Sequence, residues 1–229
     1  MPATWLTIVA WVSLAAAAIT ALTILFDIFG RRHRQRMWIM EVVWPVTALY
    51  FGPLAWLGYR RLGRAQSSVA GRHGAAEASR AVFAGKVAVG VSHCGAGCTL
   101  GDIIGAWIVL LTTLKLAGLA LYAEYIVDYA LAFSLGILFQ YYAIAPMRGI
   151  SGWAGIKAAL KADALSLTAF EVGLFGWMAV MQLIFYPGTH LTPDHAAYWL
   201  LMQVGMILGF ATSYPVNWWL IRRGIKEAM

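Results

Sequence analysis

Long apolar runs recur along this chain and constrain its fold more than any other feature. Six of them occupy residues 4–29, 37–59, 100–121, 124–146, 164–186 and 196–220. Each is close to the roughly 20 residues that a helix needs to cross the hydrocarbon core of a bilayer. Only 12% of the residues are charged, too few to coat a soluble globule of this size. The sequence therefore predicts an all-α integral membrane protein, a bundle of about six membrane-embedded helices.

The positive charge of the chain gathers at the ends of these runs. Lys and Arg outnumber Asp and Glu by 17 to 10, which gives a net charge of +7. Such residues hold short loops on the cytoplasmic side and contact anionic lipid, so we attribute the charge to topology and predict no nucleic-acid partner. We expect a multi-pass membrane protein. Arg222 and Arg223 indicate a cytoplasmic C-terminus.

The second apolar run, 37–59, conflicts with a simple topology. An Arg-rich loop precedes it and another follows it, and both should face the cytoplasm, whereas a plain crossing would separate them. Pro45 and Pro53 interrupt the run, so one interpretation is a re-entrant or broken segment. The alternatives are an outright violation of the charge rule or a seventh crossing at residues 81–98.

Composition divides the chain into three parts. Residues 1–59 hold the first two membrane segments, residues 60–92 form a connecting region, and residues 93–229 form a four-helix membrane core. The connecting region starts with a stretch rich in Gly, Ser and Arg (60–80), which predicts a linker. Residues 81–92 are apolar but too short to cross the membrane, so we expect an interfacial helix there.

The only two cysteines of the chain lie in "SHCGAGCTLGD", residues 92–102. His93, Cys94 and Cys98 offer an imidazole and two thiols, ligands that suit Zn(II) or Cu(I). Glycines beside the cysteines disfavour a helix, so we expect a loop that turns both sulfurs toward one point. The motif predicts a site for a thiophilic metal ion where the third apolar run begins.

The number of ligands separates the two metals. Two thiolates, with or without an imidazole, satisfy Cu(I), which is therefore the favoured ion, whereas Zn(II) would need Asp102 or Glu171 as a further ligand. Asp102 has a second interpretation, because Thr99 followed three residues later by an acid is typical of a capping box at a helix start. If the segment were helical instead, Cys94, Cys98 and Asp102 would share one face.

Residues with unusual side chains inside the apolar runs are further candidates. Glu171 lies about two turns into the fifth run, where a carboxylate is costly and is either functional or held by a structural hydrogen bond. Gln182 continues its helical face, and Asp128 is a second buried acid, so we expect both on an ion or proton path. Met202 and Met206 are one turn apart and would extend a path for Cu(I), although such pairs also occur as packing.

Four phrases of the sequence resemble one known family. The resemblance covers about residues 90–229 and is to the DUF4396 family, which has no assigned activity. It implies a multi-helix protein of the bacterial inner (plasma) membrane. It leaves residues 1–90 without a counterpart. The phrases are "SHCGAGCTLGDIIG" (92–105), "FQYYAIAPMRG" (139–149), "KADALSLTAFEVGLFGWMA" (161–179) and "GFATSYPVNWWLIRRGIKEAM" (209–229).

Three functions fit these observations. A membrane protein that binds or transports a metal ion, Cu(I) or Zn(II), would use both the His–Cys motif and the intramembrane acids, and it is the function that we predict. A thiol redox protein would use Cys94 as nucleophile near a helix N-terminus and Cys98 to resolve the disulfide. A structural or assembly protein would use the glycines for helix packing alone. The expected partners are the lipid bilayer, a metal ion and, in an oligomer, further copies of the chain.

Overall fold

The computed structural model describes residues 2–35, 37–64, 75–187 and 191–227, and within these ranges it holds helices and no named strand. This confirms the all-α class. Short π-helical stretches extend three of the helices: η1 (Phe26–Gly30) follows α1, η2 (Tyr59–Gly63) follows α3, and η4 (Met181–Phe185) follows α6. The helices are α1 (Thr4–Leu25), α2 (Met40–Phe51), α3 (Pro53–Gly58), α4 (Ala75–Thr112), α5 (Ala120–Arg148), α6 (Gly152–Val180) and α7 (Ala196–Arg222).

Five helices of the described residues are long and apolar enough to cross a membrane. The apolar helix Met40–Phe51 is too short to do so and accounts for the sixth predicted segment. The prediction of about six membrane-embedded helices, one of them re-entrant or broken, is therefore confirmed. The five spans are Thr4–Gly30, Ala81–Thr112, Ala120–Pro146, Gly152–Phe185 and Ala196–Arg222.

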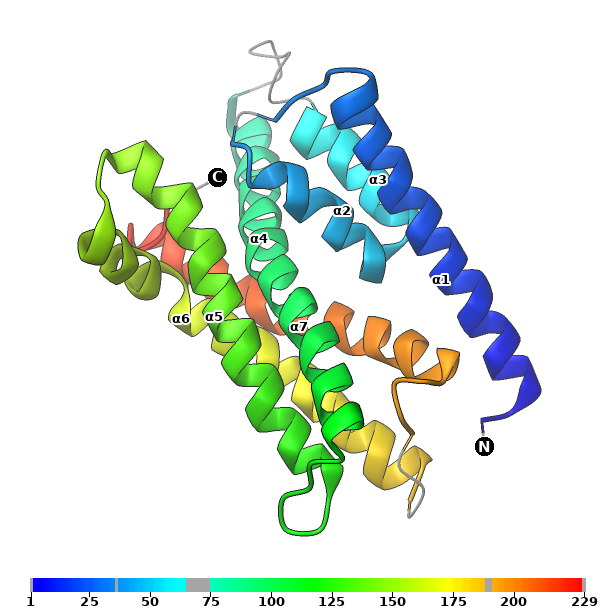
Figure 1. Ribbon diagram of the computed structural model, residues 1–229. Coiled ribbons are helices and arrows are strands. Elements are labelled where there is room, and N and C mark those ends of the chain that lie inside the picture. The colour runs from blue at the N-terminus through cyan, green and yellow to red at the C-terminus, as the bar shows by residue number, and fades with distance from the viewer. Residues whose placement is uncertain (1, 36, 65–74, 188–190, 228–229) are drawn as a thin grey trace.

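Helices α2 and α3 form a re-entrant hairpin. The chain turns at Gly52, whose φ of 54° favours glycine, and Pro53 opens α3 at a position where its missing N–H is harmless. Figure 1 shows α2 descending into the bundle and α3 returning to the end from which α2 started. Backbone at membrane depth needs a partner, and the Gln203 side chain of α7 donates a 2.7 Å hydrogen bond to the carbonyl of Leu49.

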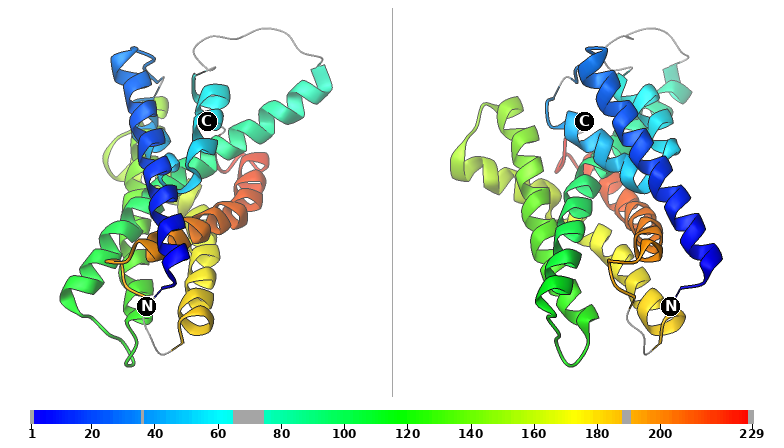
Figure 2. Two further views of the ribbon diagram at one scale, coloured as in Figure 1. Left: turned by 90° about the vertical axis from the view of Figure 1, so that its right-hand side faces the viewer. Right: turned by 45° about the vertical axis from the view of Figure 1, so that its right-hand side comes forward.

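The hairpin brings the positively charged loops to one end of the bundle. The end of α1, the end of η2, the turn between α5 and α6, and the end of α7 lie together there, opposite the N-terminus (Figures 1 and 2). Side chains connect these ends: Tyr59 donates a 2.9 Å hydrogen bond to Asp27, and Arg148 pairs with Glu227 at 2.8 Å. The conflict between charge and topology disappears because the second segment does not cross. Residues 65–74 of the predicted linker lie outside the described residues.

Helix α4 corrects two expectations. It is a single helix of 38 residues, so the predicted interfacial helix at 81–92 is wrong and the predicted boundary at residue 92 falls inside α4. The third span starts at Ala81 and ends at Thr112, which leaves residues 113–119 as a connection outside the helices. The stretch 81–92 is too short to cross alone, but it is continuous with the glycine-rich motif and the next apolar run.

Close packing against α5 explains why the glycines do not break α4. Gly97, Gly101 and Gly105 recur every fourth residue and share one face. A Cβ atom added to Gly97 would lie 2.6 Å from the Cα of Gly136, and one added to Gly101 would collide with the backbone nitrogen of Ala132. Small residues that let two backbones approach are a common basis of helix association in membranes. This contact offsets the helix-propensity cost of glycine, about 0.5–1 kcal/mol per residue relative to Ala.

The packing predicts that Gly101→Ala separates α4 from α5. Overpacking of a tight contact costs about 1–3 kcal/mol, so thermal unfolding in detergent should begin at a lower temperature than in the wild type. Gly176→Ala is the matched control, because nothing lies within 4 Å of the Cβ it would add. Equal unfolding temperatures of the two variants would contradict the packing argument.

The hairpin predicts how single cysteines are labelled in intact cells. Single cysteines would be introduced at four exposed positions of a chain that carries Cys94→Ser and Cys98→Ser. Each variant would then be treated with a membrane-impermeant thiol reagent. Arg32→Cys, Arg61→Cys and Ser151→Cys should all label from the same side of the membrane. Lys115→Cys, in the loop at the opposite end, should label from the other side. Labelling of positions 32 and 61 from opposite sides would mean that α2 and α3 cross the membrane.

Candidate functional site

The His–Cys motif lies in the middle of α4 and not in a loop. The expected loop is therefore wrong, and so is the expected capping box, because the Thr99 hydroxyl donates a 2.7 Å hydrogen bond to the carbonyl of Gly95 within the helix. The alternative of one helical face is realised: Cys94, Cys98 and Asp102 recur at four-residue spacing along α4. All three side chains are buried.

The first residue of this row belongs to a cluster near the C-terminal end of the chain. Cys94 Sγ lies 2.9 Å from Asp163 Oδ1 of α6, 3.0 Å from Ser166 Oγ and 3.0 Å from the Lys226 ammonium nitrogen. Lys226 pairs with Asp163 at 2.5 Å, and neither side chain is exposed to solvent. A charged pair is thus enclosed among α4, α6 and α7.

The electrostatics of the cluster keep Lys226 charged. Burial alone lowers the pKa of the ammonium, but the charge of Asp163, the electronegative sulfur of Cys94 and the hydrogen bonds to both outweigh it and raise the pKa of Lys226 to about 12. Asn217 of α7 accepts a 2.7 Å hydrogen bond from the same ammonium group. Its own amide nitrogen donates to Ser166 and Ser213, so the orientation of the Asn217 amide is determined by the cluster.

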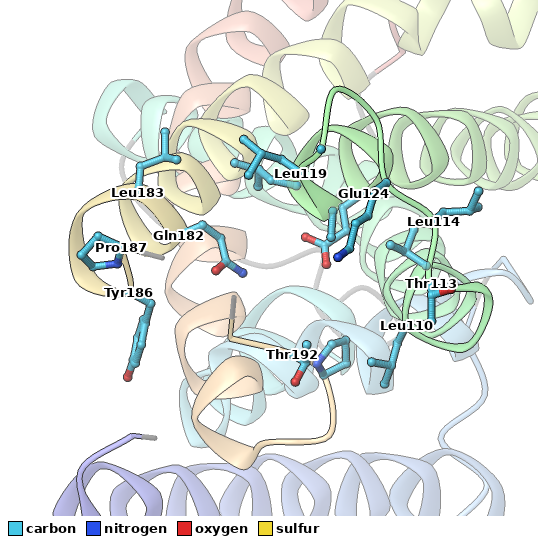
Figure 3. Close-up of a pocket in the computed structure, with 16 residues that line it drawn as sticks. Leu110, Thr113, Leu114, Leu119, Glu124, Gln182, Leu183, Tyr186, Pro187 and Thr192 are labelled. Atoms are coloured by element: carbon cyan, nitrogen blue, oxygen red, sulfur yellow. The ribbon is translucent and has the colours of Figure 1, made fainter. Parts of the chain in front are cut away.

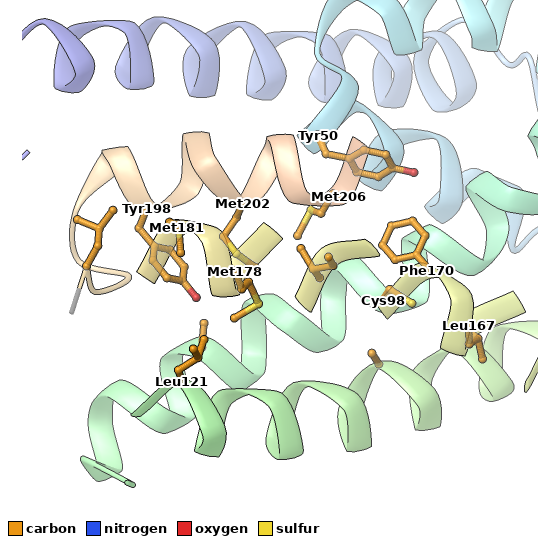
Figure 4. Packing of buried hydrophobic residues seen from close by; sticks show 14 of the residues in the cluster. Tyr50, Cys98, Leu121, Leu167, Phe170, Met178, Met181, Tyr198, Met202 and Met206 are labelled. Carbon is orange, nitrogen blue, oxygen red and sulfur yellow. The ribbon is translucent and has the colours of Figure 1, made fainter. Parts of the chain in front are cut away.

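Cys98 faces a different partner, the carboxyl group of Glu171 on α6. The two groups are close enough to interact, although neither oxygen of Glu171 has a hydrogen-bond partner of good geometry among the described residues. Tyr50, from the tip of the re-entrant hairpin, points to the same region beside Phe170 and Cys98 (Figure 4). The sequence analysis named Glu171 as a further ligand that Zn(II) would need, and that role stays a prediction.

Further buried acids continue from Glu171 toward the opposite end of the bundle. Asp102 lies within electrostatic range of both Glu171 and Asp128, and Asp128 lies within range of Glu124, one turn before it on α5. No side-chain oxygen of Asp102 or Asp128 has a hydrogen-bond partner in the part of the chain that the structure describes. The acids come from α4, α5 and α6, so only the assembled bundle makes a row of them.

The row ends at a pocket of about 560 Å³ between the α4–α5 connection and η4. Glu124 and Gln182 point into this pocket (Figure 3), whose lining also includes Lys115 and Thr192. Gln182 both donates to and accepts from the backbone of Leu191, at 3.0 and 3.1 Å. We therefore assign Gln182 to holding the loop at the pocket mouth, a structural role beside the path role predicted from the sequence.

Sulfur atoms form a second feature beside the acids. Met178, Met181, Met202 and Met206 are buried in one cluster with Cys94 and Cys98. Figure 4 shows these methionines between Tyr198 at one end and Phe170 with Cys98 at the other. Tyr198 lies within electrostatic range of Glu124, Asp128 and Asp102, so the sulfur cluster adjoins the acids. The predicted residues Met202 and Met206 are thus located beside the row.

His93 is separated from the sulfurs of its own motif. Its ring packs edge-on against Phe139 of α5 at a centroid distance of 6.2 Å, and both ring nitrogens lack a hydrogen-bond partner among the described residues. Within the described ranges, no three His, Cys, Asp or Glu side chains are grouped so that they could hold a metal ion. The metal site predicted at His93, Cys94, Cys98, Asp102 and Glu171 is not preassembled and stays a prediction.

The geometry of α4 argues against a redox pair. Both thiols are free and fully buried, and neither is near the start of the helix. Residues four apart on a helix have Cβ atoms about 5–6 Å from each other. A disulfide needs about 3.5–4.5 Å, so Cys94 and Cys98 would bond only after backbone movement.

Sequence reasoning missed the partners of Cys94. Asp163 stands among lysines near the start of an apolar run, where an interfacial acid is ordinary, and Lys226 stands in a short charged tail. The one available signal was Gly224, which follows the last span and is typical of a chain reversal after a helix.

Comparisons with known proteins identify one family. No curated protein and no solved structure matches this chain. The model of a family described as a domain of unknown function, DUF4396, matches residues 85–226, which include α5, α6, α7 and most of α4. The match covers more than half of the chain and agrees with the phrases that carried the resemblance. The chain therefore belongs to the DUF4396 family.

Proposed function

We propose that this protein moves a cation across the membrane through its helix bundle, and that the cation is a thiophilic metal ion, Cu(I) or Zn(II). The observation that supports transport most is the row of buried acids. Asp102, Asp128 and Glu171 are at most 2% exposed, and their carboxyl oxygens lack hydrogen-bond partners among the described residues. Acids inside a membrane bundle are expensive and commonly mark an ion or proton path.

The course of the row supports passage through the bundle. It begins at the pocket beside Glu124, continues through Asp128 and Asp102, and reaches Glu171 and Cys98 in the interior. A positive ion that enters such a row would supply a charge partner for Asp128, Asp102 and Glu171. Protonation would neutralise these carboxylates when the ion is absent. Ion and proton would therefore compete for the same carboxylates.

The sulfur cluster favours a soft metal ion over a hard one as the cargo. Thioethers and thiols bind Cu(I) and Zn(II) far better than Na⁺ or Mg²⁺, which prefer oxygen ligands. Cys98 faces an acid of the row, and the buried methionines adjoin it through Tyr198. A Met cluster at helical spacing is also ordinary packing, so the cargo has to be tested separately from transport.

The competing functions explain less. A purely structural protein accounts for the glycine contact between α4 and α5, but it gives no reason for unpartnered acids in the core. A thiol redox protein requires the two cysteines to meet and to be reached by a substrate, and both are buried.

We also propose the cellular orientation from the charge pattern. The end of the bundle that collects the Arg-rich loops would face the cytoplasm of a bacterial inner membrane, with the C-terminus on that side. The pocket beside Glu124 would then open toward the outside, and the Lys226 cluster would lie at the cytoplasmic end.

Transport predicts a specific effect of Glu171→Gln. The amide keeps the shape of the carboxyl group and removes its charge, so the variant should fold and unfold thermally like the wild type. A lost charged partner is worth about 1.5–3 kcal/mol, so ion flux should fall about 10- to 100-fold. The measurement is Cu(I) or Zn(II) uptake into proteoliposomes with internal pH recorded in parallel.

The same vesicles discriminate among the alternatives. Val172→Ala, a neighbouring change on the exposed face of α6, serves as the matched control and should leave flux unchanged. Proton flux without metal uptake in the wild type would make the proton the cargo and the metal assignment wrong. Absence of both fluxes, or normal flux in Glu171→Gln, would refute the transport path.

Metal content gives a test that does not depend on transport. Protein purified in buffer supplemented with copper and zinc should retain a metal ion, measured by mass spectrometry, because thiolates hold these ions tightly. The double variant Cys94→Ser/Cys98→Ser should lose it, and each single variant would show which sulfur is needed. Equal metal in wild type and double variant would rule out the predicted site.

A further inference from the structure

The tail after α7 turns back into the bundle. Gly224 adopts a left-handed φ of 67°, and the backbone N–H of Ile225 donates a 3.0 Å hydrogen bond to the carbonyl of Leu220, a helix-ending turn that reverses the chain. The turn carries Lys226 inward, and its side chain is fully enclosed. Lysine side chains are almost never fully buried unless they are paired, so the burial of Lys226 needs an explanation.

Lys226 is held by acceptors from three helices. Asp163 Oδ1 lies 2.5 Å from its nitrogen, Asn217 Oδ1 lies at 2.7 Å, Cys94 Sγ at 3.0 Å and the carbonyl oxygen of Gly90 at 3.5 Å. The second oxygen of Asp163 is buried and has no hydrogen-bond partner among the described residues. The cluster therefore has an unused acceptor even with the ammonium group in place.

We propose that this cluster is the cytoplasmic cation site of the path, and that the Lys226 ammonium occupies it as a tethered substitute for the ion. An ion that arrives from the Glu171 region displaces Lys226, and the return of Lys226 expels the ion toward the cytoplasm. The inference rests on the proposed function for the direction of passage. The binding site itself rests on the four acceptors around one cation.

The acceptors indicate which cations fit. One thiol, one carboxylate and two carbonyl oxygens can supply the four ligands that Zn(II) takes, with sulfur as the softest of them. Hydrogen bonds from Asn217 to the two serines aim its amide oxygen at the cation, as outer groups do around metal ligands. When a metal ion binds, the Cys94 thiol releases its proton to water and the ammonium group leaves the cluster still protonated.

The test uses Cd(II), whose bond to a thiolate is visible by ultraviolet absorption, in the full-length chain carrying Cys98→Ser. Cys94 is then the sole thiol. Adding Lys226→Met should empty the site of its substitute cation, and we expect Cd(II)–thiolate absorption at one ion per chain with an affinity at least tenfold above that of the Lys226 chain. Adding Asp163→Asn to Lys226→Met should abolish the gain, because the charged ligand is lost. A folded Lys226→Met chain that binds no more Cd(II) than its parent overturns the proposal.

Lys226→Met leaves Asp163 without its charge partner and can prevent folding. A second measurement therefore keeps Lys226 unchanged. Full-length wild-type protein is treated with an amine-acylating reagent and analysed by mass spectrometry. Lys226 should be protected relative to the exposed Lys157 and Lys161, and Cd(II) or Zn(II) should raise its labelling severalfold. The Cys94→Ser variant should show a smaller rise. Labelling of Lys226 that stays unchanged at saturating metal overturns the proposal in its own right.

These outcomes separate the site from the transport proposal. Cd(II) binding and Lys226 release are equilibrium measurements in detergent and require no flux. If both occur while Glu171→Gln transports normally, the cytoplasmic site stands and the acid row is not the path. If Glu171→Gln blocks transport while metal ions never increase the labelling of Lys226, the transport path stands and the proposed cytoplasmic site is wrong.

Discussion

The contact between the glycine face of α4 and the backbone of α5 is the interaction on which the rest of the structure depends. Lipid offers helices no hydrophobic reason to associate, so close packing has to provide the attraction. Gly97 and Gly101 allow it, because side chains there would collide with Gly136 and Ala132. With that face against α5, the face of Cys94, Cys98 and Asp102 is left to line the interior between α5, α6 and α7.

That interior is unusual in its electrostatics. Toward the pocket it holds Asp102, Asp128 and Glu171, acids whose oxygens have no hydrogen-bond partner among the described residues. Toward the C-terminal end it holds the fully enclosed pair of Asp163 and Lys226. A buried ion pair contributes little to stability against an apolar replacement, and unpartnered acids cost more. Function is the simplest reason for a membrane protein to retain both, and the cation path that we propose would account for their order along the bundle.

Particular residues show what could be predicted from the sequence. Glu171 was identifiable because an acid deep in an apolar run is conspicuous by itself. A break in residues 37–59 was one of the alternatives that the prolines and the charged loops on both sides of the segment left open, and the turn at Gly52 decided it. The helical state of the cysteine motif was not identifiable, because Gly97 by its intrinsic propensity disfavours a helix. The residue that packs against Gly97 and offsets this cost, Gly136, lies 39 residues further on, in α5.

The amino-acid sequence by itself determined the all-α membrane class of this protein, four of its five spans and the loops that carry positive charge. Hydropathy and charge are summed over a single segment, so no knowledge of its neighbours is required. Only the tertiary structure decided that Cys94 meets Asp163 and Lys226, that Cys98 meets Glu171, and that His93 turns toward α5 instead. These pairings depend on which faces of helices distant in the sequence pack together. The small residues of α4 and α5 set that arrangement, because they contact each other across the helix interface.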